Sequence, residues 1–133
     1  MKTLDAIVIG LGGMGSAAAY HLSSRGATVL GLDSHHAAHD LGSSHGGSRI
    51  FRQAYHEGSR YVPLVLRASE LWRKLEADSG EHIMEVTGGL LVGAPESDII
   101  LGSLLSAKMH RLAHQLLTAN ELADRFPNCI IAQ

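Results

Sequence analysis

The stretch Asp5-Ala6-Ile7-Val8-Ile9-Gly10-Leu11-Gly12-Gly13-Met14-Gly15 joins a short apolar run to a glycine-rich turn. The alanine-rich segment 16–25 follows and predicts a helix, because alanine has the highest helix propensity. Residues 28–33 then predict a second strand that ends on a carboxylate. The order strand, glycine turn, helix, strand and acid is typical of a nucleotide-binding βαβ unit. We therefore predict an α/β fold class with a Rossmann-like unit at its start.

Each glycine of the turn has a physical task in such a unit. Gly10 lets the chain leave the first strand sharply, Gly12 leaves room for a pyrophosphate, and Gly15 lets the helix approach the sheet. The helix N-terminus then offers free N–H groups to phosphates, and the Asp33 carboxylate can accept hydrogen bonds from ribose hydroxyls. The alternative is a glycine-rich turn that only caps a helix. Both strands, the helix and the acid occur in the right order, so nucleotide binding is the prediction.

Composition sets limits on the function. The chain has 133 residues, a net charge of −2, 45% hydrophobic and 18% charged residues, which is typical of a globular protein. Without a basic surplus we expect no nucleic-acid partner, and without a long apolar run we expect no membrane span. The single cysteine, Cys129, excludes an internal disulfide and fits a cytoplasmic location. Because two strands do not complete a doubly wound sheet, we expect an N-terminal piece of a larger enzyme or a truncated reading frame.

The remainder of the chain alternates loops with amphipathic segments. Pro63 begins a predicted helix that extends to about Asp78, with Trp72 on its apolar, core-facing side. Two further helices are predicted, at 98–114 behind Ser97 and at 118–125 behind a capping box. A strand is predicted at 83–92, and a long loop, which we expect to be functional, at 34–60.

Nine histidines and two arginines stand out as polar groups. The histidines at 35, 36 and 39, and the pair at 110 and 114 on one helix face, lack the partners of a metal motif, so we interpret them as surface residues. Arg49 and Arg52 follow the glycine loop and can hold an anionic group, because a guanidinium binds carboxylates through two hydrogen bonds. His45 could tune a cofactor or move protons. A solvated basic loop remains an equal alternative on these grounds.

Longer motifs show a family resemblance. Gly10 to Gly15 with Ala19, Gly26 and Asp33 fits the extended flavoprotein pattern G-x-G-x-x-G-x-x-x-[GA]-x6-G. Residues 42–55 resemble the G-S-x-H-G-x-[ST]-R-I-x-R-x-A-Y segment of monomeric sarcosine oxidase and N-methyltryptophan oxidase. Residues 57–64 continue the likeness, and residues 87–93 resemble the T-G-x-L-x-x-G strand of that family. The likeness is most specific over 5–93 and weakens through 97–133.

The resemblance implies a cofactor, a reaction and a set of site residues. The implied cofactor is FAD, and the implied substrates are dioxygen and an N-methyl amino acid, oxidised by hydride transfer to the flavin with release of formaldehyde and hydrogen peroxide. Arg52 would bind the substrate carboxylate, while His45 and Arg49 would lie against the flavin ring. The implied cofactor-binding residues are Gly10, Gly12, Gly13, Met14, Gly15, Asp33, Ser43, Ser44 and Arg49.

The resemblance also sets the expected domain plan. We expect an FAD-binding domain at 1–80 and the beginning of an α+β substrate domain at 81–133. The family attaches its flavin to a cysteine and activates dioxygen with a lysine, both far toward the C-terminus, and neither Cys129 nor Lys108 stands at the matching place. The family resemblance suggests a monomer. An NAD(P)-dependent dehydrogenase and a non-catalytic nucleotide-binding remnant are the alternative functions.

Overall fold

The computed structural model describes residues 3–128 and divides into two compact units, Met1–Ile50 and Phe51–Gln133. Cys129 and the apolar tail that it begins lie outside the described residues. This division into compact units does not test the expected domain boundary at residue 80, which stays a prediction. None of the helices in the described part is long and apolar enough to cross a membrane.

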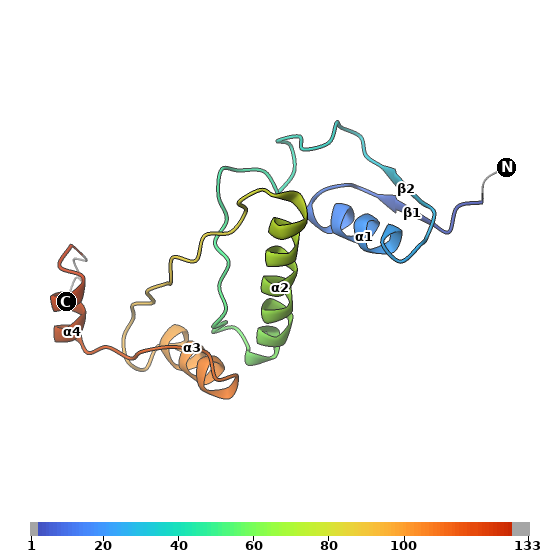
Figure 1. Cartoon of the computed structure of the whole chain (residues 1–133). Helices are drawn as coiled ribbons and strands as arrows, with labels where there is room; N and C mark the ends of the chain where they lie inside the picture. The colour runs from blue at the N-terminus through green and yellow to red at the C-terminus, as the bar shows by residue number, and fades with distance from the viewer. Residues whose placement is uncertain (1–2, 129–133) are drawn as a thin grey trace. The chain divides into compact units, whose positions relative to one another are not determined.

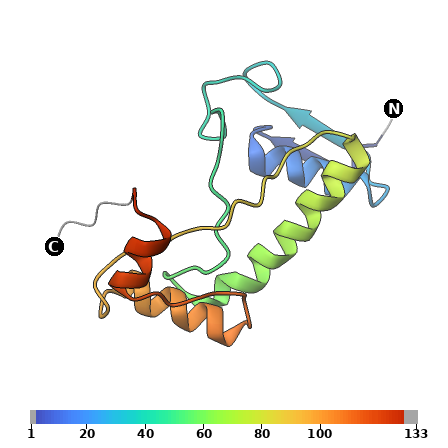
Figure 2. The ribbon, with the colours of Figure 1, turned by 60° about the vertical axis from the view of Figure 1, so that its left-hand side comes forward.

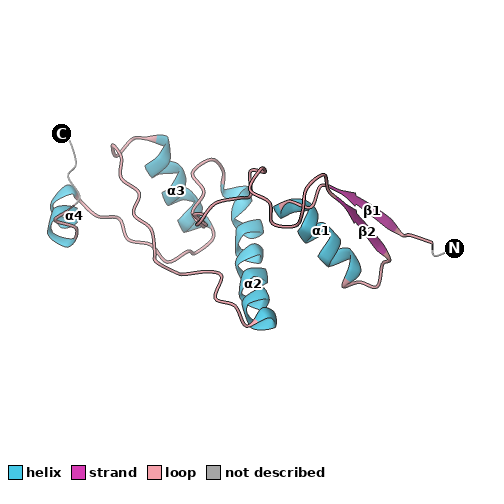
Figure 3. Cartoon of the chain, turned by 90° about the horizontal axis from the view of Figure 1, so that it is seen from above, coloured by secondary structure: helices cyan, strands magenta, loops and turns pink. Residues whose placement is uncertain are grey.

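The first unit is a parallel two-stranded sheet with one helix. Strands β1 (Ala6–Ile9) and β2 (Val29–Leu32) pair in parallel, with Ala6 opposite Val29, and helix α1 (Gly13–Ser23) connects them. Figure 3 shows α1 running alongside the two strands. This order confirms the predicted strand, helix and strand. The helix begins three residues earlier than predicted, at Gly13, so the glycine turn itself supplies its first turn.

The ends of the first unit follow from local chemistry. The ladder extends past β1, because the Gly10 N–H donates to the Leu32 carbonyl at 2.8 Å. Gly26 has a φ of 89° just beyond α1, a left-handed conformation that glycine adopts without steric cost, as expected for the residue that stops the helix. Residues 33–58 then contain no helix or strand, in agreement with the predicted loop.

The second unit is helical in its described residues. It contains the short 3-10 helix η1 (Ser59–Tyr61) and the helices α2 (Val62–Ser79), α3 (Asp98–Met109) and α4 (Ala119–Arg125), which Figure 1 colours from green to red. α2 begins with Pro63 in its first turn and ends at Gly80, which has a φ of 73°. α4 begins with the predicted capping box between Thr118 and Glu121, which is confirmed.

The core of the second unit lies where α3 meets the segment before α2. The Ser106 hydroxyl donates to the Tyr55 carbonyl at 2.5 Å, and the face of α3 that carries Ser103, Ser106 and Ala107 is buried. A Cβ on Gly102 would lie 2.4 Å from the His56 carbonyl oxygen, so only glycine permits this approach. Val62 at the start of α2 has no exposed surface and completes this contact region.

Three expectations for the second unit are wrong. Residues 83–92 form no strand but an irregular connection, yellow in Figure 2, whose first N–H groups donate to the Glu76 carboxylate of α2 instead of to a strand. The helix predicted to reach residue 114 ends at Met109, because Arg111 has a φ of 55°, so His110 and His114 share no helix face. Trp72 remains 41% exposed, so it is not a core residue.

Candidate functional site

The glycine turn is shaped by a close approach of helix and strand. Gly10 has a φ of 85°, and a Cβ on Gly15 would lie 1.7 Å from the Gly10 carbonyl oxygen. Both positions therefore require glycine for the fold itself. Gly12 differs, because its backbone is extended (φ −66°, ψ −169°) and a Cβ there would meet nothing nearer than the Ser44 hydroxyl at 3.8 Å. The space beside Gly12 is therefore open in the described part of the chain.

The N-terminus of α1 presents a backbone donor to an oxygen. The Gly13 N–H donates to the Ser44 hydroxyl at 3.0 Å, although Ser44 belongs to the distant loop 42–49. Met14 follows in the first turn and is 89% exposed. An N–H that already binds a hydroxyl oxygen at a helix N-terminus can bind a phosphate oxygen in the same way, helped by the helix dipole. The turn therefore has the chemistry of an anion site.

Asp33 stands directly after β2 and reaches back to the glycine turn. Its Oδ2 accepts the Leu11 N–H at 2.6 Å, and its Oδ1 accepts the His35 N–H at 3.0 Å. These donors, Leu11 first, hold the pKa of the Asp33 carboxyl below its ordinary value. The carboxylate is therefore ionised at neutral pH and lies at the turn, where it can accept hydrogen bonds from sugar hydroxyls.

Arg49 organises the loop that carries His45. Its Nη2 donates to the carbonyls of Ser43 and His45, each at 2.6 Å. His45 is further fixed through Nδ1, which donates to the Gly42 carbonyl. Arg49 thus closes a compact loop around its own guanidinium. The structure brings Ser43, His45 and Arg49 together, and it brings Ser44 to the glycine turn.

Arg52 belongs to the second unit and has its own surroundings. Its Nη2 donates to the Glu57 carboxylate at 3.0 Å, and its guanidinium lies 5.0 Å from the centre of the Tyr55 ring. The Glu57 N–H, and less strongly the Arg52 guanidinium, hold the pKa of Glu57 below its ordinary value. Beside this pair lies a hollow of about 400 Å³ lined by Tyr55, Glu57, Tyr61, Leu64 and Val65. Arg52 can therefore hold a carboxylate next to aromatic and apolar walls.

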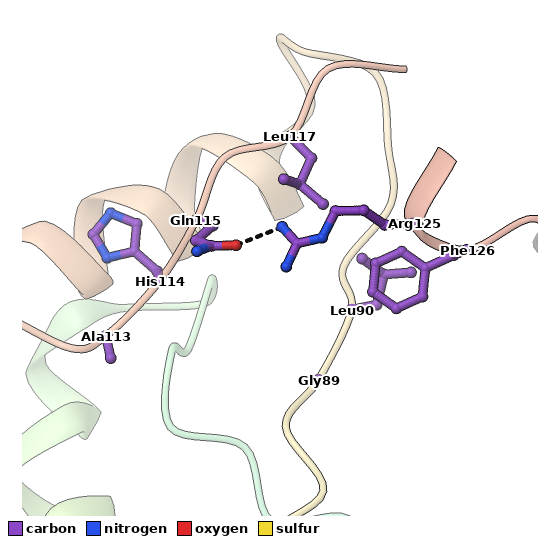
Figure 4. Close-up of a pocket in the computed structure, with 8 residues that line it drawn as sticks. All are labelled: Gly89, Leu90, Ala113, His114, Gln115, Leu117, Arg125 and Phe126. Atoms are coloured by element: carbon purple, nitrogen blue, oxygen red, sulfur yellow. Dashed lines mark hydrogen bonds between the residues drawn. The ribbon is translucent and has the colours of Figure 1, made fainter. Parts of the chain in front are cut away.

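A second hollow of the same unit contains none of the predicted site residues. It has a volume of about 490 Å³, and Figure 4 shows Arg125 reaching across it to the Gln115 side chain, with a hydrogen bond of 2.6 Å. Leu90 and Phe126 face it from separate segments, and His114 borders it. Within residues 3–128 no group of three or more histidine, cysteine or acidic side chains could hold a metal ion.

Sequence reasoning missed three partners of the site residues. Leu11 contributes only its backbone to Asp33, so no sequence signal marks it. Glu57 is opposite in charge to Arg52 and close in sequence, which is a signal that could have suggested the pair. His39 lies with Nε2 3.7 Å from Asp33 Oδ1, and its position depends on an unusual turn that the sequence does not reveal.

Comparison with known proteins connects this geometry to a family. The chain is 54% identical to a monomeric sarcosine oxidase of Streptomyces avermitilis over 125 residues, which are 94% of this chain and 33% of the relative. It is 42% identical to a monomeric sarcosine oxidase of Arthrobacter sp. over 99% of this chain and 34% of the relative. It is also 42% identical to an N-methyl-L-tryptophan oxidase of Yersinia pestis over 92% of this chain and 33% of the relative.

The chain thus spans about a third of the length of the curated relatives that it matches. A family model described as DAO, FAD dependent oxidoreductase, matches residues 5–132. The family resemblance inferred from the motifs is confirmed, and FAD rather than a nicotinamide is the cofactor of this family. The chain belongs to the DAO family of FAD-dependent oxidoreductases.

Proposed function

We propose that the first unit holds the ADP half of FAD at its glycine turn. The observation that carries this proposal is the open space at Gly12, whose extended backbone would tolerate a side chain that the protein nevertheless lacks. The Gly13 N–H already donates to the Ser44 hydroxyl at the helix N-terminus, which supports a role in binding a phosphate oxygen. These residues suit a pyrophosphate, because the open space at Gly12 lies next to a backbone donor at the helix N-terminus.

Asp33 would complete this half of the site by accepting hydrogen bonds from the ribose hydroxyls. Its contact with Leu11 places the carboxylate at the turn, and its lowered pKa keeps it an acceptor. Ser43, Ser44 and Arg49 would border the cofactor from the following loop. Arg49 would act by holding the Ser43 and His45 carbonyls, so that the His45 ring keeps one orientation toward the flavin.

Arg52 would anchor the substrate through a carboxylate. The support is its present partner, because Glu57 shows that the guanidinium can take a carboxylate beside the hollow at Tyr55. Such an anchor fixes the amine of an amino acid at a set distance from the carboxylate, and so converts binding energy into orientation. The preference for an N-methyl amino acid rests on the names of the relatives, a sarcosine oxidase and an N-methyl-L-tryptophan oxidase.

The protein that contains this chain would then be an FAD-dependent oxidase of N-methyl amino acids. When bound, FAD would supply the acceptor for the hydride that leaves the N-methyl carbon, and would supply the electrons that reduce dioxygen. The substrate gives up a hydride and a proton, water adds to the resulting imine, and the products are the primary amine, formaldehyde and hydrogen peroxide. In this scheme the chain binds the ADP half, holds His45, and fixes the substrate carboxylate through Arg52.

Two experiments test the proposal at different levels. Titration of the 133-residue chain with FAD should quench flavin fluorescence with saturation, and a Gly12→Val variant should not. For turnover, this chain can replace the matching segment of the Streptomyces avermitilis relative. The chimera should release peroxide and formaldehyde from sarcosine in equal amounts. A folded chimera that retains flavin but releases no peroxide with sarcosine or N-methyl-tryptophan would refute the substrate class, and one that retains no flavin would support a non-catalytic remnant.

A further inference from the structure

The loop after β2 folds a histidine back onto the carboxylate that ends the strand. His39 Nε2 lies 3.7 Å from Asp33 Oδ1, and the two side chains are only 17% and 14% exposed. The proposed function uses Asp33 but gives His39 no role. The contact joins residues that are separated by a turn, so the fold itself brings them together.

The hydrogen bond at the second ring nitrogen of His39 determines which of the two nitrogens carries the proton in the neutral ring. The Leu41 N–H donates to His39 Nδ1 at 3.1 Å, so Nδ1 carries the lone pair. In the neutral ring the proton is therefore on Nε2, the nitrogen that faces Asp33. His39 thus presents an N–H to Asp33 without needing a charge, and the backbone of Leu41 selects this tautomer.

The backbone of the loop is bent in a way that favours this contact. Ala38 has a φ of 61°, a left-handed conformation that costs free energy for any residue except glycine. The bend comes directly before His39. The His35 ring packs edge-on against the His39 ring at 4.8 Å and limits its rotation. His39 is therefore held in one orientation by the turn at Ala38, by the His35 ring and by the Leu41 N–H.

We propose that His39 is a positioning residue that fixes the Asp33 carboxylate for the ribose hydroxyls of the cofactor. The inference rests on the proposed function, in which Asp33 accepts those hydroxyls. A carboxylate has about four acceptor positions. Leu11 and His35 each donate to one of the two oxygens, and His39 Nε2 lies 3.7 Å from Oδ1, a polar contact longer than a hydrogen bond. These contacts limit the rotation of the carboxylate, so the ribose meets an acceptor that is already oriented.

The test compares two ligands that differ only in the ribose hydroxyls, ADP and 2′,3′-dideoxy-ADP, in calorimetric titrations of the 133-residue chain. His39→Leu should weaken ADP binding about fivefold, because it removes a polar contact of 3.7 Å that limits the rotation of the Asp33 carboxylate. It should leave the affinity for the dideoxy ligand unchanged. His39→Gln, which keeps an N–H and an acceptor, should restore ADP affinity to within about twofold of the parent chain.

A control histidine lies on helix α1 and makes no ring contact with His39. His21→Leu removes a ring that packs edge-on against Tyr20, and ADP affinity should not change. If His39→Leu weakens both ligands equally, or if His39→Gln restores nothing, His39 is a structural residue only and the inference fails. Failure of the proposed function has a different signature: Asp33→Asn would then leave the ratio of ADP to dideoxy-ADP affinity unchanged.

Discussion

Replacement of Gly15 by alanine should distort the glycine turn, because the added Cβ would clash with the backbone of the turn itself. The added Cβ would lie 1.7 Å from the Gly10 carbonyl oxygen, 2.9 Å from the Gly10 carbonyl carbon and 3.4 Å from a methyl group of Val8. An ordinary contact needs about 3.5 Å, so α1 must withdraw from β1 by about 1.8 Å. Overpacking of this kind costs typically 1–3 kcal/mol of folding stability.

The same displacement should abolish tight FAD binding. A shift of that size removes the helix N–H groups from phosphate oxygens, and each lost charge-assisted hydrogen bond costs about 1.5 kcal/mol or more. Loss of two such bonds weakens binding about a hundredfold. Gly12→Val provides the contrast, because a Cβ at Gly12 would meet only the Ser44 hydroxyl, at 3.8 Å, and the side chain would occupy the space that we propose for the pyrophosphate. It should therefore lose FAD binding while keeping the parent's unfolding midpoint.

The assay pairs urea unfolding, followed by circular dichroism, with FAD titration by fluorescence quenching. Gly47→Ala is the control, since a Cβ there would meet nothing within 4 Å. It should change neither the unfolding midpoint nor the FAD affinity. Equal unfolding midpoints and FAD affinities within about threefold for Gly15→Ala and the parent chain would refute the packing argument. An unstable Gly12→Val variant would refute the distinction between the two glycines.

Further predictions concern the second unit. In the chimera, Arg52→Ala should raise KM for sarcosine at least about tenfold while flavin content stays normal, because a charge-assisted hydrogen bond is lost; loss of flavin instead would contradict the anchor role. Glu57→Gln should lower KM by at most about fivefold, since it removes a competing carboxylate from an exposed pair, and an increase in KM would show that Glu57 orients Arg52. The N–H groups of Met84 and Ile83, with Arg73, lower the pKa of Glu76 from 4.5 to about 2. Its stabilising contribution is therefore present above pH 4.5 and lost as pH falls toward 2. Urea midpoints between pH 6 and 2.5 should fall less steeply in Glu76→Gln, and parallel curves would contradict the prediction.

The first unit could be predicted from sequence because its signals are local. A glycine that must adopt a positive φ, an alanine-rich helix and two short apolar runs each determine their own backbone. The capping box at Thr118 was predictable for the same reason, since both partners lie within one helical turn. Element ends were less certain, and α1 begins at Gly13 because the turn and the helix share residues.

The strand that was wrongly predicted at 83–92 shows that local sequence patterns do not determine whether a segment finds a strand partner. Its apolar residues suit a strand, yet a strand needs a partner for its N–H and C=O groups. The Glu76 carboxylate takes the N–H groups of Ile83 and Met84 in the described chain. The same limit applies to α2, whose periodicity predicts an apolar, core-facing side, although Leu64 on that side remains 69% exposed. Periodicity gives the face of an element, and only tertiary contacts give its partner.

The two arginines of the loop illustrate how geometry separates roles that sequence leaves joined. Three residues apart, Arg49 and Arg52 could be interpreted as one clamp for a single anion. Arg49 instead donates to the carbonyls of Ser43 and His45, neutral groups of its own loop that no anion would replace without opening that loop. Arg52 faces Glu57, an exposed carboxylate that another carboxylate can displace. Only Arg52 is therefore suited to exchange its partner for a substrate, and Arg49 is suited to keep the loop in shape while that exchange takes place.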